Sequence, residues 1–212
     1  MPVPFVLASQ SPARLASLRS AGVEPRVIVS AVDEDAALAD AANTALTAGK
    51  TLAPADAVLA LARAKATAVA STHTTGAIVL GCDSMLEFNG EILGKPADAA
   101  EARDRWRAMR GRTGTLHTGH WLVDDRSGNE PTECGATSST VVHFANLADD
   151  EVDAYVATGE PLQVAGAFTV DGLGGPYVEA IEGDFHGVVG VSLPLLRHLL
   201  ADLGVAFHEL RS

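Results

Sequence analysis

The segment of residues 76–96 constrains the fold more than any other, and it reads G-A-I-V-L-G-C-D-S-M-L-E-F-N-G-E-I-L-G-K-P. Residues 77–80 are apolar without a polar break, which is typical of a strand buried on both faces of a sheet. Asp83 follows, so we predict that its carboxylate lies at the C-terminal end of this strand. Ligands bind outside the carboxyl ends of strands in open α/β sheets, and this position therefore favours chemistry.

A hairpin after this strand is predicted to bring a lysine back toward the carboxylate. Asn89 and Gly90 tolerate the positive φ angles of a type I′ turn between two short strands. The chain would then return Lys95 to the neighbourhood of Asp83. One group suits a phosphate and the other a metal ion or water. A capped strand end with a surface lysine is the competing interpretation.

Composition and charge limit the class of protein. The chain has 212 residues, of which 47% are hydrophobic and 20% charged, so one domain over residues 1–212 with a single buried core is expected. A formal net charge of -12 argues against nucleic acid polymers and anionic membranes, since both require clustered Lys and Arg. The sequence shows no membrane-spanning segment, no basic signal region and too few cysteines for a disulfide scaffold. A cytoplasmic location is therefore expected.

The N-terminal region predicts an anion site. Residues 5–8 read as a buried strand that leads directly into a helix, with Ser11 as its N-cap and Pro12 as its first residue. Free backbone N–H groups and the positive end of the helix dipole attract anions. The hydroxyls of Ser9 and Ser11 and the guanidinium of Arg14 add to this attraction. A plain capped helix with a surface arginine is the alternative.

Sequence patterns predict the remaining elements. Helices are expected over residues 54–70, 98–109, 149–157 and 192–203, and strands over residues 26–29, 115–123, 137–144 and 205–207. Residues 40–53 lack a clear period and are expected to form an irregular surface segment. The three carboxylates at 33–35 read as a solvated loop, with a metal site as the alternative. The glycine-rich block over residues 159–190 would let backbone approach a ligand closely.

With these segments in view, the chain resembles the Maf family of nucleoside triphosphate pyrophosphatases, once called septum formation inhibitors. The motifs that carry the resemblance, in the family's order, are L-A-S-Q-S-P-A-R-L at residues 7–15, V-D-E at 32–34, A-R-A-K-A around Lys65, G-C-D-S at 81–84, G-K-P at 94–96, T-G-E-P at 158–161, A-G-A-F-T-V-D-G at 165–172 and G-D-F-H-G-V-V-G-V-S-L-P from 183. The resemblance implies a Maf- and inosine-triphosphatase-like α/β fold. Such a fold has an elongated mixed β-sheet flanked by helices, and two lobes with a central cleft.

The resemblance also implies an activity and a set of site residues. The activity is hydrolysis of a nucleoside triphosphate to the monophosphate and pyrophosphate with a divalent cation, Mg²⁺ or Mn²⁺, and family members suggest a homodimer. Asp83 matches the family's proton acceptor, and Glu34 with Asp83 would hold the metal. The residues that would bind the substrate are Ser9, Ser11, Arg14, Lys65 and Lys95.

Three positions that choose the base in the family depart from its best-known members, namely Ala13, Ser84 and Asp171. Arginine or tryptophan, threonine, and glutamine or glutamate are usual at these positions. The base preference is therefore not carried over, and dTTP, UTP and a modified nucleotide all remain candidates.

Two other functions stay open. A nucleotide-binding regulatory module linked to cell division would use the same anion site with little turnover. A phosphomonoesterase would use Asp83 as a covalent nucleophile, although the D-S-M sequence lacks the paired aspartates that this chemistry usually needs. The scattered histidines lack metal-ligand spacing and are interpreted as structural or surface residues. Trp106 and Trp121 are expected to pack in the core, and Trp121 is the better candidate for stacking on a base.

Overall fold

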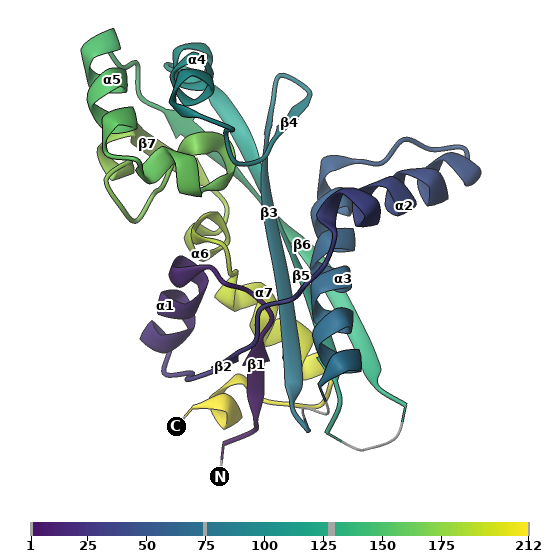
Figure 1. Ribbon diagram of the computed structural model, residues 1–212. Coiled ribbons are helices and arrows are strands. Elements are labelled where there is room, and N and C mark those ends of the chain that lie inside the picture. Colours follow the sequence, from purple (N-terminus) through teal and green to yellow (C-terminus); the bar gives the residue numbers. More distant parts are fainter. Residues whose placement is uncertain (1, 74–75, 127–129, 212) are drawn as a thin grey trace.

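A mixed seven-stranded sheet forms the centre of the computed structural model, which describes residues 2–73, 76–126 and 130–211 (Figure 1). The strand order is β2-β1-β3-β5-β6-β7, and β4 pairs with β3. β1 runs parallel to β2 and β3, and the other pairs are antiparallel. The strands are β1 Phe5–Leu7, β2 Arg26–Val27, β3 Ile78–Phe88, β4 Glu91–Leu93, β5 Thr113–Asp124, β6 Thr132–Phe144 and β7 Val178–Glu182.

Helices cover both faces of this sheet, so the predicted class of a mixed α/β sheet flanked by helices is confirmed. In Figure 1, α2 and α3 lie on one side of β3, and α1 and α6 lie on the other. The helices are α1 Pro12–Ser20, α2 Glu34–Thr47, α3 Pro54–Thr72, α4 Ala99–Met109, α5 Asp149–Ala157, α6 Phe185–Val189 and α7 Leu193–Asp202. Short 3-10 helices cover Glu160–Gln163, Ala165–Ala167, Gly175–Tyr177 and Phe207–Leu210.

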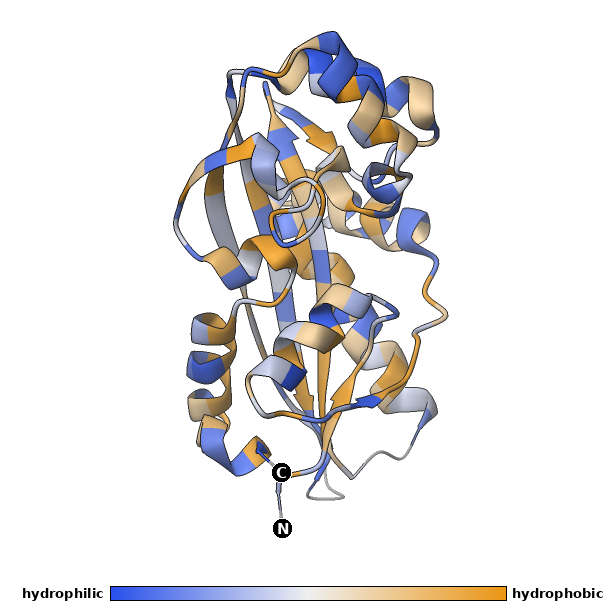
Figure 2. Ribbon diagram, turned by 90° about the vertical axis from the view of Figure 1, so that its left-hand side faces the viewer, coloured by the Kyte–Doolittle hydropathy of each residue, from blue (hydrophilic) through white to orange (hydrophobic). Residues whose placement is uncertain are grey.

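Two hydrophobic cores share one face of β3. Leu80 and Cys82 belong to the first core, which includes residues of α1 and α7. Leu86 and Phe88 belong to the second core, which includes residues of α4 and α5. Figure 2 views the molecule from this side and shows the helices of the two cores one above the other. Ser84 lies between them on the same face, so the two cores are separated at the middle of β3.

The prediction that Asp83 ends its strand is wrong. β3 continues to Phe88 because β5 pairs with it all the way from Ile78 to Glu87. β1 pairs only with residues 78–80 of β3, and β4 only with residues 86–88. Asp83 therefore lies beyond the carboxyl end of β1. It lies beside a stretch of the β3 edge that pairs with neither β1 nor β4.

The prediction of an irregular segment over residues 40–53 is also wrong for its first half, because α2 continues to Thr47. Asp33 is the N-cap of α2, and its side chain accepts a hydrogen bond from the backbone N–H of Ala36 at 3.0 Å. Glu34 and Asp35 occupy the first turn, where negative charge favours the helix dipole. The three carboxylates therefore start a helix, and they do not form a loop.

The predicted strand over residues 205–207 is absent, since Phe207–Leu210 form a 3-10 helix. The hairpin is confirmed, with φ angles of 54° at Asn89 and 83° at Gly90. Trp106 lies in the second core and donates to the carbonyl of Ala167, as its core prediction requires. Trp121 is partly buried against a third core cluster, as predicted, and lies under the Arg63 guanidinium, 4.8 Å from the ring centroid.

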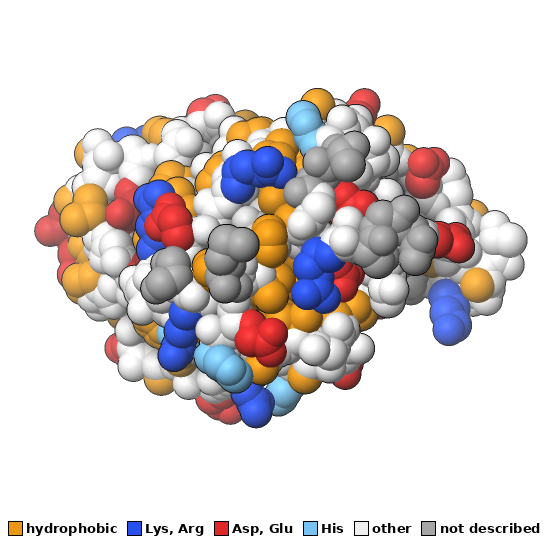
Figure 3. Space-filling view, turned by 90° about the horizontal axis from the view of Figure 1, so that it is seen from below, with side chains coloured by type: hydrophobic (Ala, Val, Ile, Leu, Met, Phe, Trp, Pro, Cys, Tyr) orange, Lys and Arg blue, Asp and Glu red, His pale blue; other side chains and the backbone are white. Residues whose placement is uncertain are grey.

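The surface and the helices add two observations about possible partners. In the view from below in Figure 3, basic side chains are dispersed among acidic and hydrophobic ones. Among the described residues, no helix combines the length and the apolar character needed to cross a bilayer.

A buried histidine that the sequence patterns did not single out ties the sheet to α7. His120 is fully buried; its Nε2 accepts from the Ser192 N–H at 2.8 Å, so its Nδ1 donates to the Thr118 carbonyl at 3.0 Å. Burial, helped by the nearby Arg14 charge, lowers the pKa of His120 to about 4. The folded chain therefore holds a neutral imidazole.

We expect this histidine to make the protein less stable in acid. Its folded pKa lies below the unfolded value near 6.5, so the stabilisation is complete above pH 6.5 and is lost as pH falls toward 4. The loss amounts to about 3 kcal/mol. Urea unfolding between pH 4 and 7 measures it, and His120→Asn should flatten the profile while the exposed His198→Asn should not. Parallel profiles for wild type and His120→Asn would contradict the assignment.

Candidate active site

Helix α3 lies against the sheet at two glycines, and this contact positions Lys65 beside Asp83. A Cβ on Gly81 would lie 2.1 Å from the Ala62 carbonyl oxygen, and one on Gly119 would lie 2.3 Å from that of Val58. Side chains at these positions would hold the helix away from β3 and β5. Because Gly119 pairs with Asp83, the close approach occurs directly beside the carboxylate.

Three charged groups meet at this contact. The Nζ of Lys65 lies 2.6 Å from Asp83 Oδ1 and 2.8 Å from Glu34 Oε1. The side chains of Lys65 and Asp83 are only 11% and 12% exposed, whereas that of Glu34 is 54% exposed. Burial raises the pKa of Asp83, and the charges of Lys65 and Arg14 oppose that rise. A buried carboxylate with a perturbed pKa is typical of a reaction site.

Arg14 contacts the same part of β3 from the face of the sheet opposite to Asp83. Its Nε donates to the Gly190 carbonyl at 3.0 Å, and its Nη1 donates to Cys82 O at 2.9 Å and to Ser9 Oγ at 3.1 Å. Its Nη2 donates to Ser84 Oγ at 3.1 Å. Four of its five N–H donors are thus engaged within the protein. The guanidinium fixes the loop after β1, the edge of β3 and the turn before α7.

The N-terminus of α1 has the predicted form. Ser11 caps it, accepting from the Arg14 N–H at 3.4 Å, and its own N–H donates to the buried Ser9 hydroxyl at 3.2 Å. Ala13 is half-buried in the first turn. Ser9, Ser11 and Arg14 are thereby brought together, as the motif over residues 7–15 predicts.

Ser84 is part of a hydrogen-bonded chain that includes Thr118, a residue for which the sequence predicted no role. Thr118 Oγ1 donates to the Gly187 carbonyl at 2.8 Å and lies 2.9 Å from Ser84 Oγ. Since the Thr118 proton is committed to Gly187, Ser84 donates to Thr118 and accepts from Arg14. The chain joins α6 to the centre of β3. Thr118 has no motif of its own, and only the β3–β5 register reveals it.

Lys95 and Asp171 make no hydrogen bond or ion pair with the Asp83 group in the described part of the chain. Lys95 is exposed after β4, and the pairing of Leu93 with Leu86 brings that end of β4 back toward Ser84. Asp171 is exposed on the glycine-rich loop. The structure therefore groups Asp83 with Lys65 and Glu34, and leaves Lys95 and Asp171 at the surface.

Glu160, in the T-G-E-P motif, shapes the loop that carries Asp171. Its carboxylate accepts from Tyr155 Oη at 3.0 Å and from the backbone N–H groups of Leu173 at 3.0 Å and Gly174 at 3.1 Å. No role for this residue was predicted from the sequence. Its place in a motif was the available signal.

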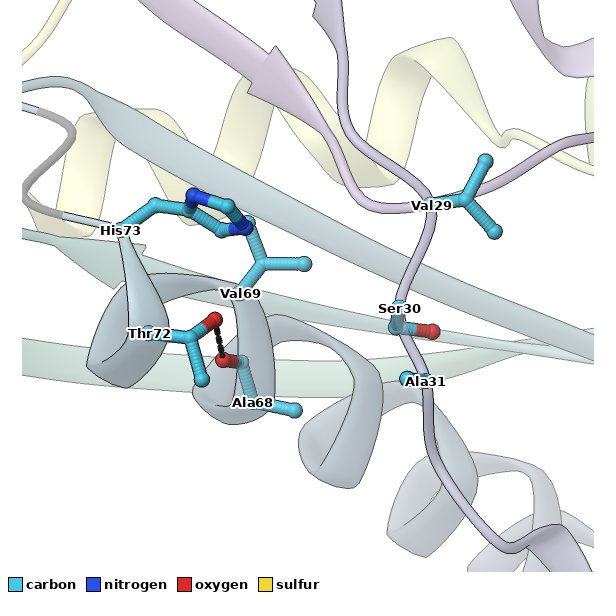
Figure 4. A pocket seen from close by; sticks show the side chains of 7 residues that line it. All are labelled: Val29, Ser30, Ala31, Ala68, Val69, Thr72 and His73. Atoms are coloured by element: carbon cyan, nitrogen blue, oxygen red, sulfur yellow. Dashed lines mark hydrogen bonds between the residues drawn. The ribbon is translucent and has the colours of Figure 1, made fainter.

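A cavity of about 150 Å³ lies beside α3, away from the charged group (Figure 4). Its lining comes from the loop after β2 and the last turns of α3, and consists of Val29, Ser30, Ala31, Ala68, Val69, Thr72 and His73. It contains neither Lys65 nor Asp83. Chemistry is better assigned to the buried ion pair than to this small space, which no charged carboxylate or lysine lines.

The family model described as Maf-like protein matches residues 4–203. The chain belongs to the Maf-like protein family. This confirms the resemblance inferred from the motifs. A nucleoside triphosphate pyrophosphatase of Streptomyces coelicolor is 55% identical to this family member over 207 residues, which cover 97% of this chain and 93% of the relative. One of Salinispora tropica is 53% identical over 209 residues, covering 97% and 86%.

A solved HAM1 protein of Coxiella burnetii is 18% identical to this Maf family member and has a TM-score of 0.38. The match covers 68% of this chain and 74% of the other. A TM-score at this level supports no conclusion about the fold or the activity.

Proposed function

We propose that this chain hydrolyses a nucleoside triphosphate to the monophosphate and pyrophosphate, with Asp83 accepting a proton from the attacking water. The observation that supports it is the buried Lys65–Asp83 pair at the uncovered edge of β3. The names of the two close relatives point to the same reaction. Such hydrolysis requires mainly positioning and charge stabilisation, together with one proton acceptor.

Each charged group has a role in this proposal. Lys65 and Lys95 hold the triphosphate and offset the charge on the leaving pyrophosphate. Ser9, Ser11 and the helix start behind them bind a phosphate through N–H and hydroxyl groups. Arg14 holds these groups in position through the four hydrogen bonds that it donates, and its remaining N–H donates to the substrate.

The residues present fit a divalent cation. Glu34 and Asp83 both lie within 2.8 Å of one positive charge, the Lys65 ammonium, so their carboxylates already converge on a single cationic centre. Mg²⁺ and Mn²⁺ accept one or two carboxylates together with phosphate oxygens and water. No cluster of three His, Cys, Asp or Glu ligands occurs among the described residues, so substrate and water would complete the shell. The ion would neutralise phosphate charge.

Removing Lys65 should shift the acid limb of the pH profile of kcat/KM toward higher pH. The Lys65 charge lowers the pKa of Asp83, so its loss in Lys65→Met raises the pKa further, and more protons must leave before the base is active. The pH profile of kcat/KM measures the shift. Lys50→Met, which changes an exposed lysine beyond α2, should leave the limb in place. An unmoved or lowered limb in Lys65→Met would contradict Asp83 as the titrating base.

A substrate panel tests the proposed reaction. The purified chain is incubated with Mg²⁺ or Mn²⁺ and each common, methylated or deaminated nucleoside triphosphate, including dTTP and UTP, and pyrophosphate and phosphate are measured separately. Pyrophosphate release supports the proposal. Phosphate release would support the phosphomonoesterase, and binding without product would support the regulatory module. A single domain, a cytoplasmic location and a homodimer stay predictions.

A further inference from the structure

Helix α4 holds the backbone on both sides of Lys95. Arg105 Nη1 donates to the carbonyl of Gly94, directly before the lysine, at 2.6 Å. Glu101, one helical turn earlier, accepts from the N–H of Ala97, two residues after the lysine, at 2.7 Å. Arg105 Nη2 also donates to Glu101 Oε1 at 2.5 Å, so the two contacts belong to one ion pair. We call Arg105 and Glu101 the α4 clamp.

The residue after Lys95 restricts this segment further. Pro96 is buried, and a residue that precedes a proline is confined to extended backbone conformations. The Lys95 side chain, in contrast, is exposed and forms no ion pair or hydrogen bond within the described part of the chain. A lysine with a fixed backbone and an unpaired ammonium is suited to bind an anion that arrives from solution.

The Gly94 carbonyl also joins the end of β4 to the glycine-rich block. It accepts a second hydrogen bond, from the N–H of Gly166 at 3.0 Å, beside the one from Arg105. Trp106, the next residue of α4, donates to the carbonyl of Ala167 at 2.7 Å. Two adjacent side chains of α4 therefore fix the end of β4 and the glycine-rich block relative to each other.

Arg105 differs in its contacts from its neighbours on α4. Arg103 and Arg107 pair with carboxylates of α4 and α5, whereas Arg105 reaches β4. Its side chain is 13% exposed, compared with 42% for Arg107. The hydrogen bonds from the Ala97 N–H and from Arg105 lower the pKa of Glu101, which favours the charged form of the clamp. The clamp is therefore built as a connection between α4 and the lysine segment.

We infer that Arg105 is a positioning residue for Lys95, because it holds the lysine backbone where the ammonium can meet the phosphates of the substrate. This inference rests on the proposed function, in which Lys95 holds the triphosphate. A loosened lysine loses more conformational freedom on binding than a fixed one, so breaking the clamp weakens the phosphate contact. Arg105 does not touch the substrate and acts through Lys95 alone.

A double-mutant cycle between Arg105→Met and Lys95→Ala tests this role. Arg105→Met removes the donors but keeps an apolar side chain, and it should lower kcat/KM by about tenfold, the usual effect of losing a hydrogen bond from a charged group. In the Lys95→Ala background the same change should stay within about twofold, because no ammonium is left to position. Arg107→Met is the matched control and should leave kcat/KM unchanged in both backgrounds.

Two results of the cycle would overturn the inference. Equal losses in both backgrounds would show that Arg105 supports the fold in general and not Lys95. An unchanged kcat/KM in Arg105→Met would show that the lysine does not depend on the clamp. Thermal unfolding verifies that each variant is folded. If Arg105→Met does not fold, the cycle is run with Arg105→Lys, whose ammonium can reach one of the two acceptors, and the same comparison decides.

Binding measurements separate this inference from the proposed hydrolysis. If no nucleotide is hydrolysed, Kd values for GTP and UTP with Mg²⁺ are measured by calorimetry on the four proteins of the cycle. A loss of affinity in Arg105→Met that disappears in the Lys95→Ala background supports the positioning role although hydrolysis fails. Equal losses in both backgrounds, or no loss, reject it. Absence of binding by the wild type also rejects it, since Lys95 then holds no phosphate.

Discussion

Asp83→Asn is expected to lower the rate of pyrophosphate release at least about 100-fold while the fold is retained. An amide cannot accept the proton of water, and a general base typically contributes a factor of about 10² to 10⁴. The asparagine oxygen can still accept the hydrogen bond that Lys65 now donates at 2.6 Å, so the buried ammonium keeps a partner. Single-turnover kinetics with excess enzyme measures the chemical step.

Asp153→Asn is the matched control for this change. Asp153 pairs with Arg103 at the surface of α5, and its side chain is 54% exposed. Its loss should leave turnover unchanged, because exposed ion pairs contribute little. Thermal unfolding verifies that both variants are folded. A folded Asp83→Asn protein with a near wild-type rate would remove Asp83 from its proposed role.

Gly81→Ala is expected to destabilise the chain by at least about 3 kcal/mol and to abolish most activity. The new Cβ would lie 2.1 Å from the Ala62 carbonyl oxygen and 2.8 Å from the Ala66 nitrogen, both of which are helix backbone. Backbone cannot rotate away, so α3 must move off the sheet, and such overpacking is costly. The same movement would separate Lys65 from Asp83. Urea unfolding and pyrophosphate release measure the two effects.

Gly94→Ala separates this clash from a general cost of replacing glycine. A Cβ at Gly94 meets nothing within 4 Å, and its φ is not in the left-handed region. Its unfolding free energy should therefore stay close to that of wild type. Equal stability of Gly81→Ala and wild type would show that α3 does not depend on the glycine for its position.

Local sequence chemistry was sufficient to predict many elements. The N-cap serine and following proline of α1, the Asn-Gly turn and the capping aspartate of α4 act through neighbours only a few residues away. Such signals can be read without knowing the fold. Residues 40–47 escaped prediction because an alanine-rich helix with no buried residue has no apolar stripe to recognise.

For the candidate site, the sequence by itself determined which groups are present: the motifs supplied Asp83, Lys65 and Glu34 and indicated the family. Only the tertiary structure decided how they meet. Asp83 lies at an unpaired edge of β3 because β5 keeps β3 extended past the end of β1. Lys65 reached it because two glycines let α3 lie against the sheet. Ser84 and Thr118 come from two strands, and only the sheet register joins them. Contacts between distant segments depend on strand register and helix approach, which local patterns do not encode.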